Sequence, residues 1–189
     1  MRVIFMGTPE FAVPSLCALA DAFEVALVIT RPDAVRGRGK RLVPSPVKAE
    51  AVSRGIEVIE TNRMTPEVLD AMRAVSADII CVAAYGCILP DAVLEMAPLG
   101  CVNVHASLLP RWRGAAPIQR SILEGDERTG VSIMRVAHEL DAGAWCRQAS
   151  VQIGEKDAAT LTAELAQLGA EELVGALPEL AAHEETWHE

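Results

Sequence analysis

Short apolar segments rich in β-branched residues alternate along this chain with segments of helical period, and this alternation constrains the fold more than any other feature. Such alternation is typical of β-α-β units, in which successive strands run parallel in one sheet. The runs at residues 78–83 and 101–105 are nearly continuous in apolar residues, so we predict central strands buried on both faces. The full set of predicted strands covers residues 2–6, 24–30, 56–60, 78–83, 101–105, 131–136 and 145–153.

Capping residues followed directly by proline mark the predicted starts of three helices. A side-chain oxygen at the cap and a proline in the first turn favour a helix start. These starts are Thr8-Pro9-Glu10, Ser45-Pro46 and Thr65-Pro66-Glu67. A short helix is expected after Pro117 and a long one over 159–180. With no internal repeat and no interdomain linker, we expect one domain, 1–189, with an α/β, Rossmann-like fold: a mostly parallel sheet with helices on both faces.

Composition excludes several classes of protein. Apolar residues make up 51% of the chain, yet charges, Gly or Pro interrupt every apolar run before it reaches the length of a membrane helix. The N-terminus lacks the pattern of a signal peptide, so we expect a cytoplasmic protein. The five cysteines form no C-x-x-C, and the four histidines are dispersed. We therefore expect reduced thiols and no metal.

The charge distribution is more informative than the formal net charge of −9, which alone argues against a nucleic-acid partner. Six basic residues and one acidic residue lie between Arg31 and Lys48, in a stretch rich in Gly and Pro. On charge alone, a solvated surface loop is the preferred interpretation. Gly37-Arg38-Gly39-Lys40 lacks the other residues of a P-loop, and Gly7-Thr8-Pro9 lacks the glycines of a dinucleotide fingerprint. We expect neither nucleotide hydrolysis nor a nicotinamide cofactor.

Asn103 and His105 are candidate catalytic residues at the carboxyl end of a predicted central strand. Strand alternation places both side chains on one face, at the edge where open α/β sheets bind ligands. An amide beside an imidazole suits the stabilisation of an oxyanion in acyl transfer, and Asp141 is the candidate partner of the imidazole. Capping or hydrogen-bonded core groups, with an ordinary Asp-x-Gly turn, remain an equal alternative from these residues alone.

Longer motifs carry a resemblance. The run from Asn103 through His105 to Ser107-Leu108-Leu109-Pro110 and Arg113-Gly114, with Leu140-Asp141-x-Gly143 further on, resembles the formyltransferase family that uses 10-formyltetrahydrofolate. Within that family the chain resembles the branch that acts on methionyl-tRNA. Branch-like stretches are Gly7-Thr8-Pro9-Glu10-Phe11-Ala12, Gly37-Arg38-Gly39-Lys40, Pro44-Ser45-Pro46-Val47-Lys48, Ala84-Tyr85-Gly86-Cys87-Ile88-Leu89-Pro90 and residues 110–120.

The resemblance implies formyl transfer from 10-formyltetrahydrofolate, without a metal, to the α-amine of initiator methionyl-tRNA by a monomer. It implies three groups of site residues. The catalytic set is Asn103, His105 and Asp141; folate contacts are Tyr85, Ile88, Leu89, Ser107, Leu108, Leu109 and Pro110; tRNA contacts are Arg38, Lys40 and Arg41.

Two departures from the branch and two alternatives remain. Ala144 stands where the branch often carries an acid, and the chain contains nothing to supply the branch's second, β-barrel domain, which binds tRNA. The first alternative is a formyltransferase acting on a small amine, either a purine-precursor ribonucleotide or an amino sugar. The second is a folate- or RNA-binding domain without turnover. His183 and His188 lie in a polar C-terminal tail, for which we expect disorder.

Overall fold

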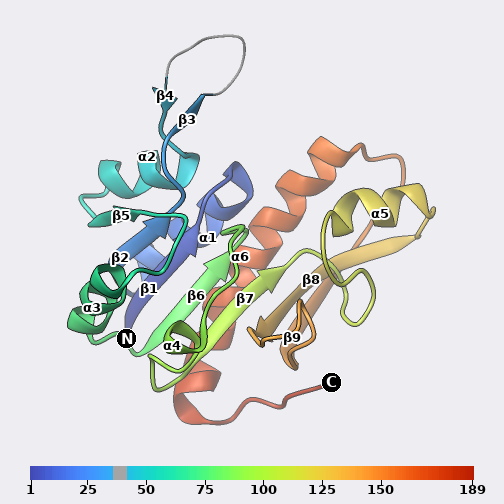
Figure 1. The fold of residues 1–189 in the computed structure, drawn as a ribbon. Coiled ribbons are helices and arrows are strands. Elements are labelled where there is room, and N and C mark those ends of the chain that lie inside the picture. Colours follow the sequence, from blue (N-terminus) through green and yellow to red (C-terminus); the bar gives the residue numbers. More distant parts are fainter. Residues whose placement is uncertain (36–41) are drawn as a thin grey trace. The chain divides into compact units, whose positions relative to one another are not determined.

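The computed structural model describes residues 1–35 and 42–189, which form two compact units, Met1–Cys101 (unit 1) and Val102–Glu189 (unit 2). Figure 1 shows the helices and strands of both. None of the helices within these described ranges is long and apolar enough to cross a membrane.

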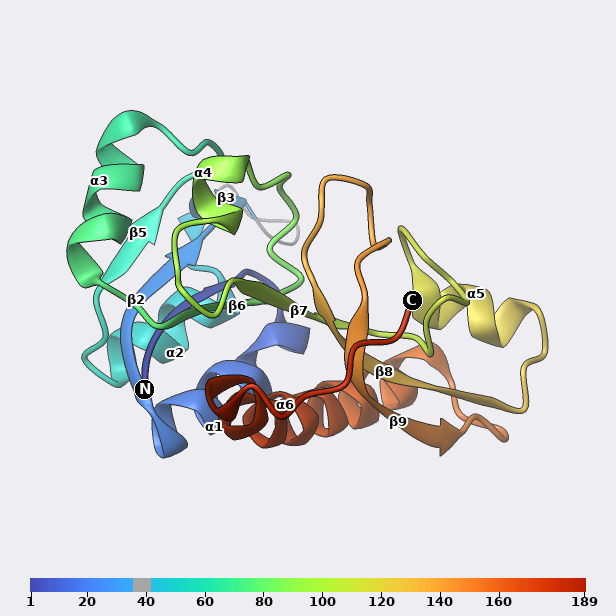
Figure 2. The ribbon, with the colours of Figure 1, turned by 90° about the horizontal axis from the view of Figure 1, so that it is seen from below.

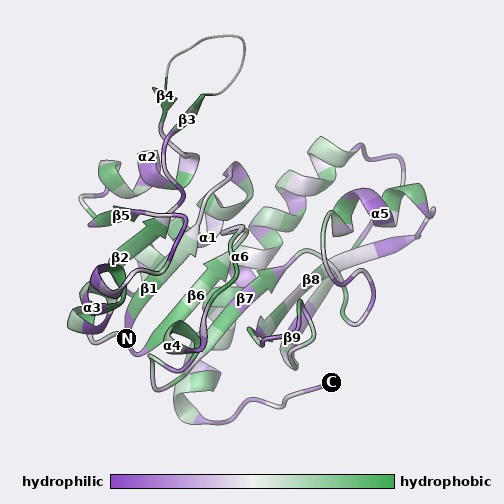
Figure 3. Ribbon diagram, viewed as in Figure 1, coloured by the Kyte–Doolittle hydropathy of each residue, from purple (hydrophilic) through white to green (hydrophobic). Residues whose placement is uncertain are grey.

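Four parallel strands form the sheet of unit 1, in the order β5-β2-β1-β6. Their bounds are β1 Arg2–Gly7, β2 Glu24–Thr30, β5 Val58–Glu60 and β6 Ile79–Ala83. The runs from Val3 to Met6 and from Ile79 to Ala83 are buried throughout, as expected for central strands covered on both faces. Figure 3 shows the apolar character of these strands.

The helices of unit 1 cover both faces of its sheet. Helices α1 (Val13–Ala22) and α2 (Pro46–Ser53) lie on one face, with α3 (Pro66–Val75) and the short α4 (Asp91–Leu94) on the other (Figure 2). Ser45 caps α2 by accepting a hydrogen bond from the Lys48 N–H at 3.0 Å, and Thr65 caps α3, as predicted.

The predicted start of the first helix is wrong. Residues Glu10–Ala12 form a 3-10 turn, and the α-helix begins at Val13. The Thr8 hydroxyl donates to the Tyr85 carbonyl at 3.1 Å and caps no helix. Gly7 explains the tight passage at the end of β1, because an added Cβ would lie 2.9 Å from both the Ala83 carbonyl oxygen and the Ala12 Cβ. Tertiary packing therefore overrides the local capping signal.

Unit 2 is built on three antiparallel strands. Strand β8 (Arg128–Arg135) pairs with β7 (Cys101–His105) on one side and with β9 (Trp145–Gln152) on the other. Helix α5 (Pro117–Leu123) contacts β8, and the long α6 (Ala158–Ala182) packs on β8 and β9. Asp157 caps α6 by accepting from the Thr160 N–H at 2.8 Å. The buried positions of α6 recur at helical period, from Leu161 to Leu180.

The C-terminal tail is placed against unit 2, so the expectation of disorder for this segment is wrong. After α6, His188 forms an isolated β-bridge with Trp145, and the two rings stack with centroids 4.4 Å apart. The polar composition of this segment predicted disorder. Its backbone pairing with Trp145 and its aromatic contacts instead hold it against the edge strand β9.

Candidate active site

Asn103, His105 and Asp141 belong to the same unit, and two of them lie on one strand. Asn103 and His105 are two positions apart on β7, so their side chains share one face. Their cross-strand neighbours on β8 are Met134 and Ser132, respectively. Val104, between them, points to the opposite face, toward Gly169 of α6. Asp141 comes from the loop between β8 and β9.

The side chain of His105 is 7% exposed, and its ring lies between two oxygen atoms. Its Nε2 is 3.0 Å from the Trp112 carbonyl oxygen, and its Nδ1 is 3.6 Å from Oδ2 of Asp141. An imidazole can donate from both ring nitrogens only as the imidazolium ion. Each ring nitrogen of His105 faces an oxygen atom of the protein.

The carboxylate of Asp141 is oriented by the backbone. Its Oδ2 accepts a hydrogen bond from the Gly114 N–H at 2.9 Å, and its side chain is 17% exposed. Asp141 has φ 48°, which an Asp tolerates better than most residues. Gly143 allows the loop to close, because an added Cβ would lie 2.0 Å from the Arg135 carbonyl oxygen. The Asp-x-Gly motif thus aims the carboxylate at His105.

The side chain of Asn103 is half-buried and stands beside this pair. Within residues 1–35 and 42–189, no hydrogen bond holds its amide. A partly buried amide without a protein partner can donate to a substrate oxygen without first breaking an internal bond.

The segment from Ser107 to Pro110 is held by a hydrogen-bond cluster that the sequence analysis missed. The Ser132 hydroxyl donates to the Ser107 carbonyl at 2.7 Å and accepts from the Leu109 N–H at 3.1 Å. Nε2 of Gln148 donates to the Leu109 carbonyl at 2.9 Å and to Ser132 Oγ at 2.8 Å. The Leu109-Pro110 peptide is cis. Ser132 and Gln148 therefore fix the backbone of the predicted folate segment.

Exposure divides the predicted folate residues of this segment. The Ser107 hydroxyl is fully buried and donates to the Arg111 carbonyl at 2.6 Å, and Leu109 is also buried. Leu108 is half-buried and Pro110 is exposed. Of these four side chains, those of Leu108 and Pro110 are accessible to solvent, while those of Ser107 and Leu109 are buried.

Asp126 supports the loop that supplies the Trp112 carbonyl, and no sequence motif indicated it. Its carboxylate binds the Arg111 guanidinium through both oxygens, at 2.6 and 2.9 Å, and accepts from the Trp112 indole N–H at 2.7 Å. The hydrogen bond from Arg111, followed by that from Trp112, lowers the pKa of Asp126. The Arg111 guanidinium also lies 4.3 Å from the centre of the Trp112 ring.

The other predicted folate residues, Tyr85, Ile88 and Leu89, follow β6 in unit 1. Tyr85 is 2% exposed and its hydroxyl donates to the Thr61 carbonyl at 2.8 Å. Burial is the main cause that raises the pKa of this phenol. Leu89 is buried as well, whereas Ile88 is 93% exposed. Of these three side chains, Ile88 is the one open to a ligand.

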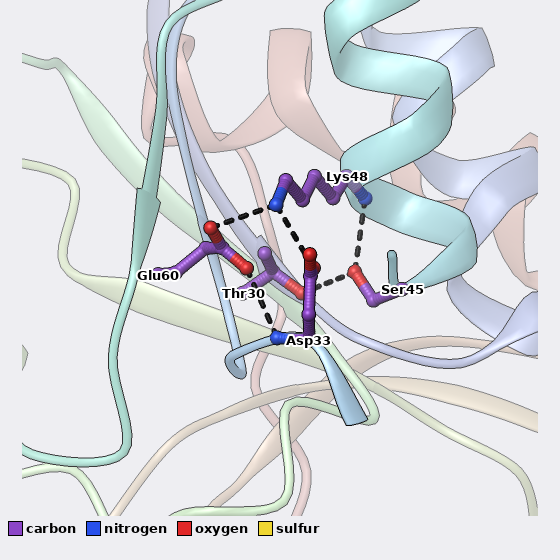
Figure 4. Close-up of polar contacts among 5 residues, drawn as sticks. All are labelled: Thr30, Asp33, Ser45, Lys48 and Glu60. Atoms are coloured by element: carbon purple, nitrogen blue, oxygen red, sulfur yellow. Dashed lines mark hydrogen bonds and ion pairs between the residues drawn. The ribbon is translucent and has the colours of Figure 1, made fainter. Parts of the chain in front are cut away.

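The basic stretch between Arg31 and Lys48 contains two short strands that form the base of a hairpin. Strands β3 (Ala34–Val35) and β4 (Leu42–Val43) pair antiparallel. At their base, the hydroxyls of Thr30 and Ser45 share a buried hydrogen bond of 2.8 Å (Figure 4). Arg38, Lys40 and Arg41, the predicted tRNA contacts, lie outside the described residues.

The ammonium group of Lys48 forms ion pairs within this anchor. Its Nζ lies 2.9 Å from Oδ1 of Asp33 and 2.8 Å from Oε2 of Glu60, and Glu60 also accepts from the Asp33 N–H at 3.0 Å (Figure 4). Hydrogen bonds to Glu60 and then Asp33 raise the pKa of Lys48. Lys48 therefore belongs to the base of the hairpin, and the basic character available to a partner is smaller than the sequence count suggested.

The cysteines are free, and Cys81 and Cys101 are buried. Burial raises the pKa of Cys101 to about 12 and that of Cys81 well above its ordinary value. In the part of the chain that the structure describes, no group of three or more His, Cys, Asp or Glu side chains is arranged to hold a metal ion.

Comparison with known proteins gives close sequence relatives. The chain is 53% identical over 184 residues to the methionyl-tRNA formyltransferase of Xanthomonas axonopodis pv. citri, and 51% identical over 185 residues to that of Methylococcus capsulatus. Each alignment covers 96% of this chain and 60% of the relative. The chain thus spans about three fifths of the length of these relatives.

Solved structures share the fold at lower sequence identity. Glycinamide ribonucleotide transformylase 1 from Symbiobacterium toebii superposes with a TM-score of 0.78 at 19% identity, covering 97% of this chain and 88% of that one. A sugar N-formyltransferase from a Shewanella species gives 0.72 at 20% identity, covering 100% and 73%. The predicted α/β, Rossmann-like formyltransferase fold is confirmed. A family model described as formyl transferase matches residues 1–177, so this chain belongs to the formyl transferase family.

Proposed function

We propose that this chain is the catalytic part of an enzyme that transfers a formyl group from 10-formyltetrahydrofolate to the α-amine of initiator methionyl-tRNA. The observation that carries the chemistry is the Asn103 amide, to which none of the described residues is hydrogen-bonded, on the same strand face as a His105 ring 3.6 Å from Asp141. The acceptor is inferred from relatives that are 51–53% identical and named methionyl-tRNA formyltransferases.

In the proposed reaction, the α-amine of the methionyl group attacks the formyl carbon, and the carbonyl electron pair moves onto oxygen. Asn103 and His105 stabilise this oxyanion by hydrogen bonds, which is worth about 10²–10³ in rate for each such donor. The tetrahedral intermediate then collapses, the bond from carbon to N10 of the folate breaks, and N10 takes up a proton while the amine loses one. Asp141 stabilises the imidazolium form of His105 and assists these proton movements, directly or through water.

His105 must exchange one hydrogen bond to act in this way. Its Nε2 faces the Trp112 carbonyl at 3.0 Å, so contact with the formyl oxygen requires this bond to be replaced. The carbonyl belongs to a loop in which Trp112 and Gly114 have φ values of 60° and 85°. We infer that substrate binding shifts this loop.

Folate binding is assigned to two segments. Tyr85, Ile88 and Leu89 follow β6, and Ser107, Leu108, Leu109 and Pro110 follow β7. The exposure of Ile88 and Pro110 supports direct contact, and the buried members of each segment hold the backbone.

Acceptor binding is assigned to Arg38, Lys40 and Arg41. The anchored base of the hairpin, at Thr30, Asp33, Ser45, Lys48 and Glu60, supports this assignment because it holds the described residues on either side of the basic stretch. The proposal includes a monomeric enzyme that acts in the cytoplasm. Neutralising these three basic residues together is expected to weaken tRNA binding and flatten its salt dependence.

The decisive experiment measures formyl transfer from 10-formyltetrahydrofolate to methionyl-tRNA, glycinamide ribonucleotide and an amino-sugar nucleotide, with His105→Ala as the blank. His183→Asn is the matched control, because His183 is exposed and its φ of 56° is one that Asn tolerates. Transfer to methionyl-tRNA that is lost in His105→Ala and kept in His183→Asn supports the proposal. Transfer to a small amine alone, or to no acceptor, contradicts it.

A further inference from the structure

The C-terminal tail, residues 183–189, contacts both ends of the loop that carries Asp141. This loop, residues 136–144, connects Arg135, the last residue of β8, with Trp145, the first residue of β9. The backbone N–H of Trp145 donates to the His188 carbonyl, and the His188 N–H donates to the Trp145 carbonyl, both at 2.9 Å. The two rings stack at an interplanar angle of 24°.

The other end of the loop is held through its side chain. The Arg135 guanidinium lies 4.3 Å from the centre of the Trp187 ring, and one of its nitrogens is 3.9 Å from Oε1 of Glu185. The Trp187 indole N–H donates to the same Glu185 oxygen at 3.0 Å. The Glu185 side chain is 9% exposed, although the tail residues on either side of it are open to solvent. Glu185, Trp187 and His188 thus form a staple across Arg135 and Trp145.

Arg135 also makes the contacts that close the loop. The Arg135 N–H donates to the Ala144 carbonyl at 2.8 Å, and Gly143 passes close to the Arg135 carbonyl. Asp141 lies two residues before Gly143, has a left-handed backbone, and reaches His105 across a gap of 3.6 Å. A small shift of the loop ends therefore changes the distance between Asp141 and His105.

We propose that Glu185, Trp187 and His188 are positioning residues for Asp141: the tail keeps the loop closed so that the carboxylate stays directed at His105. This inference rests on the proposed function, in which Asp141 acts on His105. Strand β9 pairs on one side with β8, and without the tail the backbone of Trp145 loses its partners on the other side. Misplacement of a catalytic group by about 1 Å can cost on the order of 10²-fold in rate.

The test compares Trp187→Ala with Trp187→Phe and with the control Glu184→Ala. Phenylalanine keeps a ring under Arg135, whereas alanine removes it, and Glu184 is an exposed tail residue outside the staple. Amide hydrogen exchange of residues 136–144 is measured in each variant, together with kcat and KM for formyl transfer. In Trp187→Ala we expect exchange in the loop to rise about tenfold, with unchanged exchange in β7 and α6.

The kinetic expectation separates positioning from general stability. In Trp187→Ala, kcat should fall about tenfold while KM for the folate stays within about twofold, and Trp187→Phe should restore most of kcat. Unchanged exchange in the loop, or equal loosening of the loop, β7 and α6, overturns the proposal. Full activity in Asp141→Asn would instead overturn the proposed function, whatever the exchange data show for the tail.

Discussion

The carboxylate of Asp141 presents one oxygen to two groups: Oδ2 accepts a hydrogen bond from the Gly114 N–H at 2.9 Å and lies 3.6 Å from Nδ1 of His105. The first contact is short and the second is long, so the backbone of Gly114 fixes the carboxylate while the interaction with the imidazole can still tighten. Catalytic hydrogen bonds are often long before substrate binds. Asp141 thus supplies a carboxylate in a fixed orientation beside the imidazole of His105.

Asp141→Asn tests this charge. The amide oxygen can still accept from Gly114, so we expect the fold and the loop to persist while the stabilisation of an imidazolium is lost. Single-turnover formyl transfer should slow by about 10²–10⁴-fold. Glu139→Gln, an exposed change in the same loop, should leave the rate unaltered. A rate for Asp141→Asn within a factor of about three of the unmodified chain would remove Asp141 from the catalytic set.

Ser132→Ala tests the cluster that holds the predicted folate segment. The substitution leaves the Leu109 N–H, the Ser107 carbonyl and one contact of Gln148 without their shared partner in a fully buried position. We expect a loss of about 1–3 kcal/mol in the free energy of unfolding, measured with urea, and weaker folate binding. Ser150→Ala removes one exposed hydrogen bond from Arg128, which water can replace, so this control should change neither quantity appreciably. Unaltered folate affinity in Ser132→Ala would contradict the role given to this cluster.

Local signals in the sequence predicted the strands and the catalytic candidates because both follow short-range rules. Apolar β-branched runs located the seven strands β1, β2 and β5 to β9 but not the short pair β3 and β4, and alternation correctly placed Asn103 and His105 on one face. Ser132 could have been suspected, because a serine inside an apolar strand needs a hydrogen-bond partner. Its partners in the segment 107–109 come from another part of the chain, and no local rule names them.

Other features depend on long-range contacts. Thr8 carries a strong local capping signal, yet its hydroxyl bonds to Tyr85, 77 residues away in the sequence. Asp126 has no motif, and its role follows from the position of Arg111 and Trp112. The tail was expected to be disordered from its polar composition, but Trp187 contacts Arg135 and His188 contacts Trp145. Pairing of β8 with β9 places Arg135 and Trp145 at these positions, and no local rule predicts that pairing with the tail.

Buried thiols should make the chain lose stability in alkali. Burial raises the pKa of Cys101 from its ordinary value of 9.0 to about 12. Below pH 9 the thiol is protonated in both states, so its contribution to stability is complete. As the pH rises from 9 toward 12, the unfolded chain ionises while the folded chain does not, and this contribution is lost.

Cys101→Ala isolates this effect. Between pH 9 and 10 the unmodified chain should lose about 1 kcal/mol more free energy of unfolding than Cys101→Ala, although the variant starts from a lower stability at pH 7 because of the smaller side chain. Urea denaturation at both pH values measures the difference. Equal losses in the two proteins would show that Cys101 ionises as readily in the folded state as in the unfolded one.

Lys48→Met tests the anchor of the basic hairpin. The substitution leaves Asp33 and Glu60 without the cation that joins them, so we expect the hairpin to be held less firmly. KM for methionyl-tRNA should rise about threefold, the scale of an ion pair near the surface, while KM for the folate stays unchanged. Lys156→Met, which removes a similar pair with Glu164, is the control. A parallel rise in both KM values would indicate general damage to unit 1.

Two glycines of α6 provide a matched test of how this helix packs on its sheet. At Gly169 an added Cβ would lie 2.5 Å from Cγ1 of Val104, a buried and short side chain in the middle of strand β7, and 3.7 Å from Cγ1 of Val131. At Gly175 the nearest atoms, at 3.3 Å, belong to the end of the flexible Arg147 side chain. Alanine gains up to about 1 kcal/mol in helix propensity at either position.

Gly169→Ala should nevertheless destabilise the chain by about 1–3 kcal/mol, because overpacking at a buried contact outweighs the gain in propensity. Gly175→Ala should be close to neutral or slightly stabilising, provided that Arg147 keeps its ion pairs with Glu172 and Glu179. Urea unfolding of both variants measures the difference. Because Val104 lies between Asn103 and His105 on β7, Gly169→Ala should also slow formyl transfer, whereas Gly175→Ala should not. Equal stability and equal rates in the two variants would show that α6 is free to shift on the sheet.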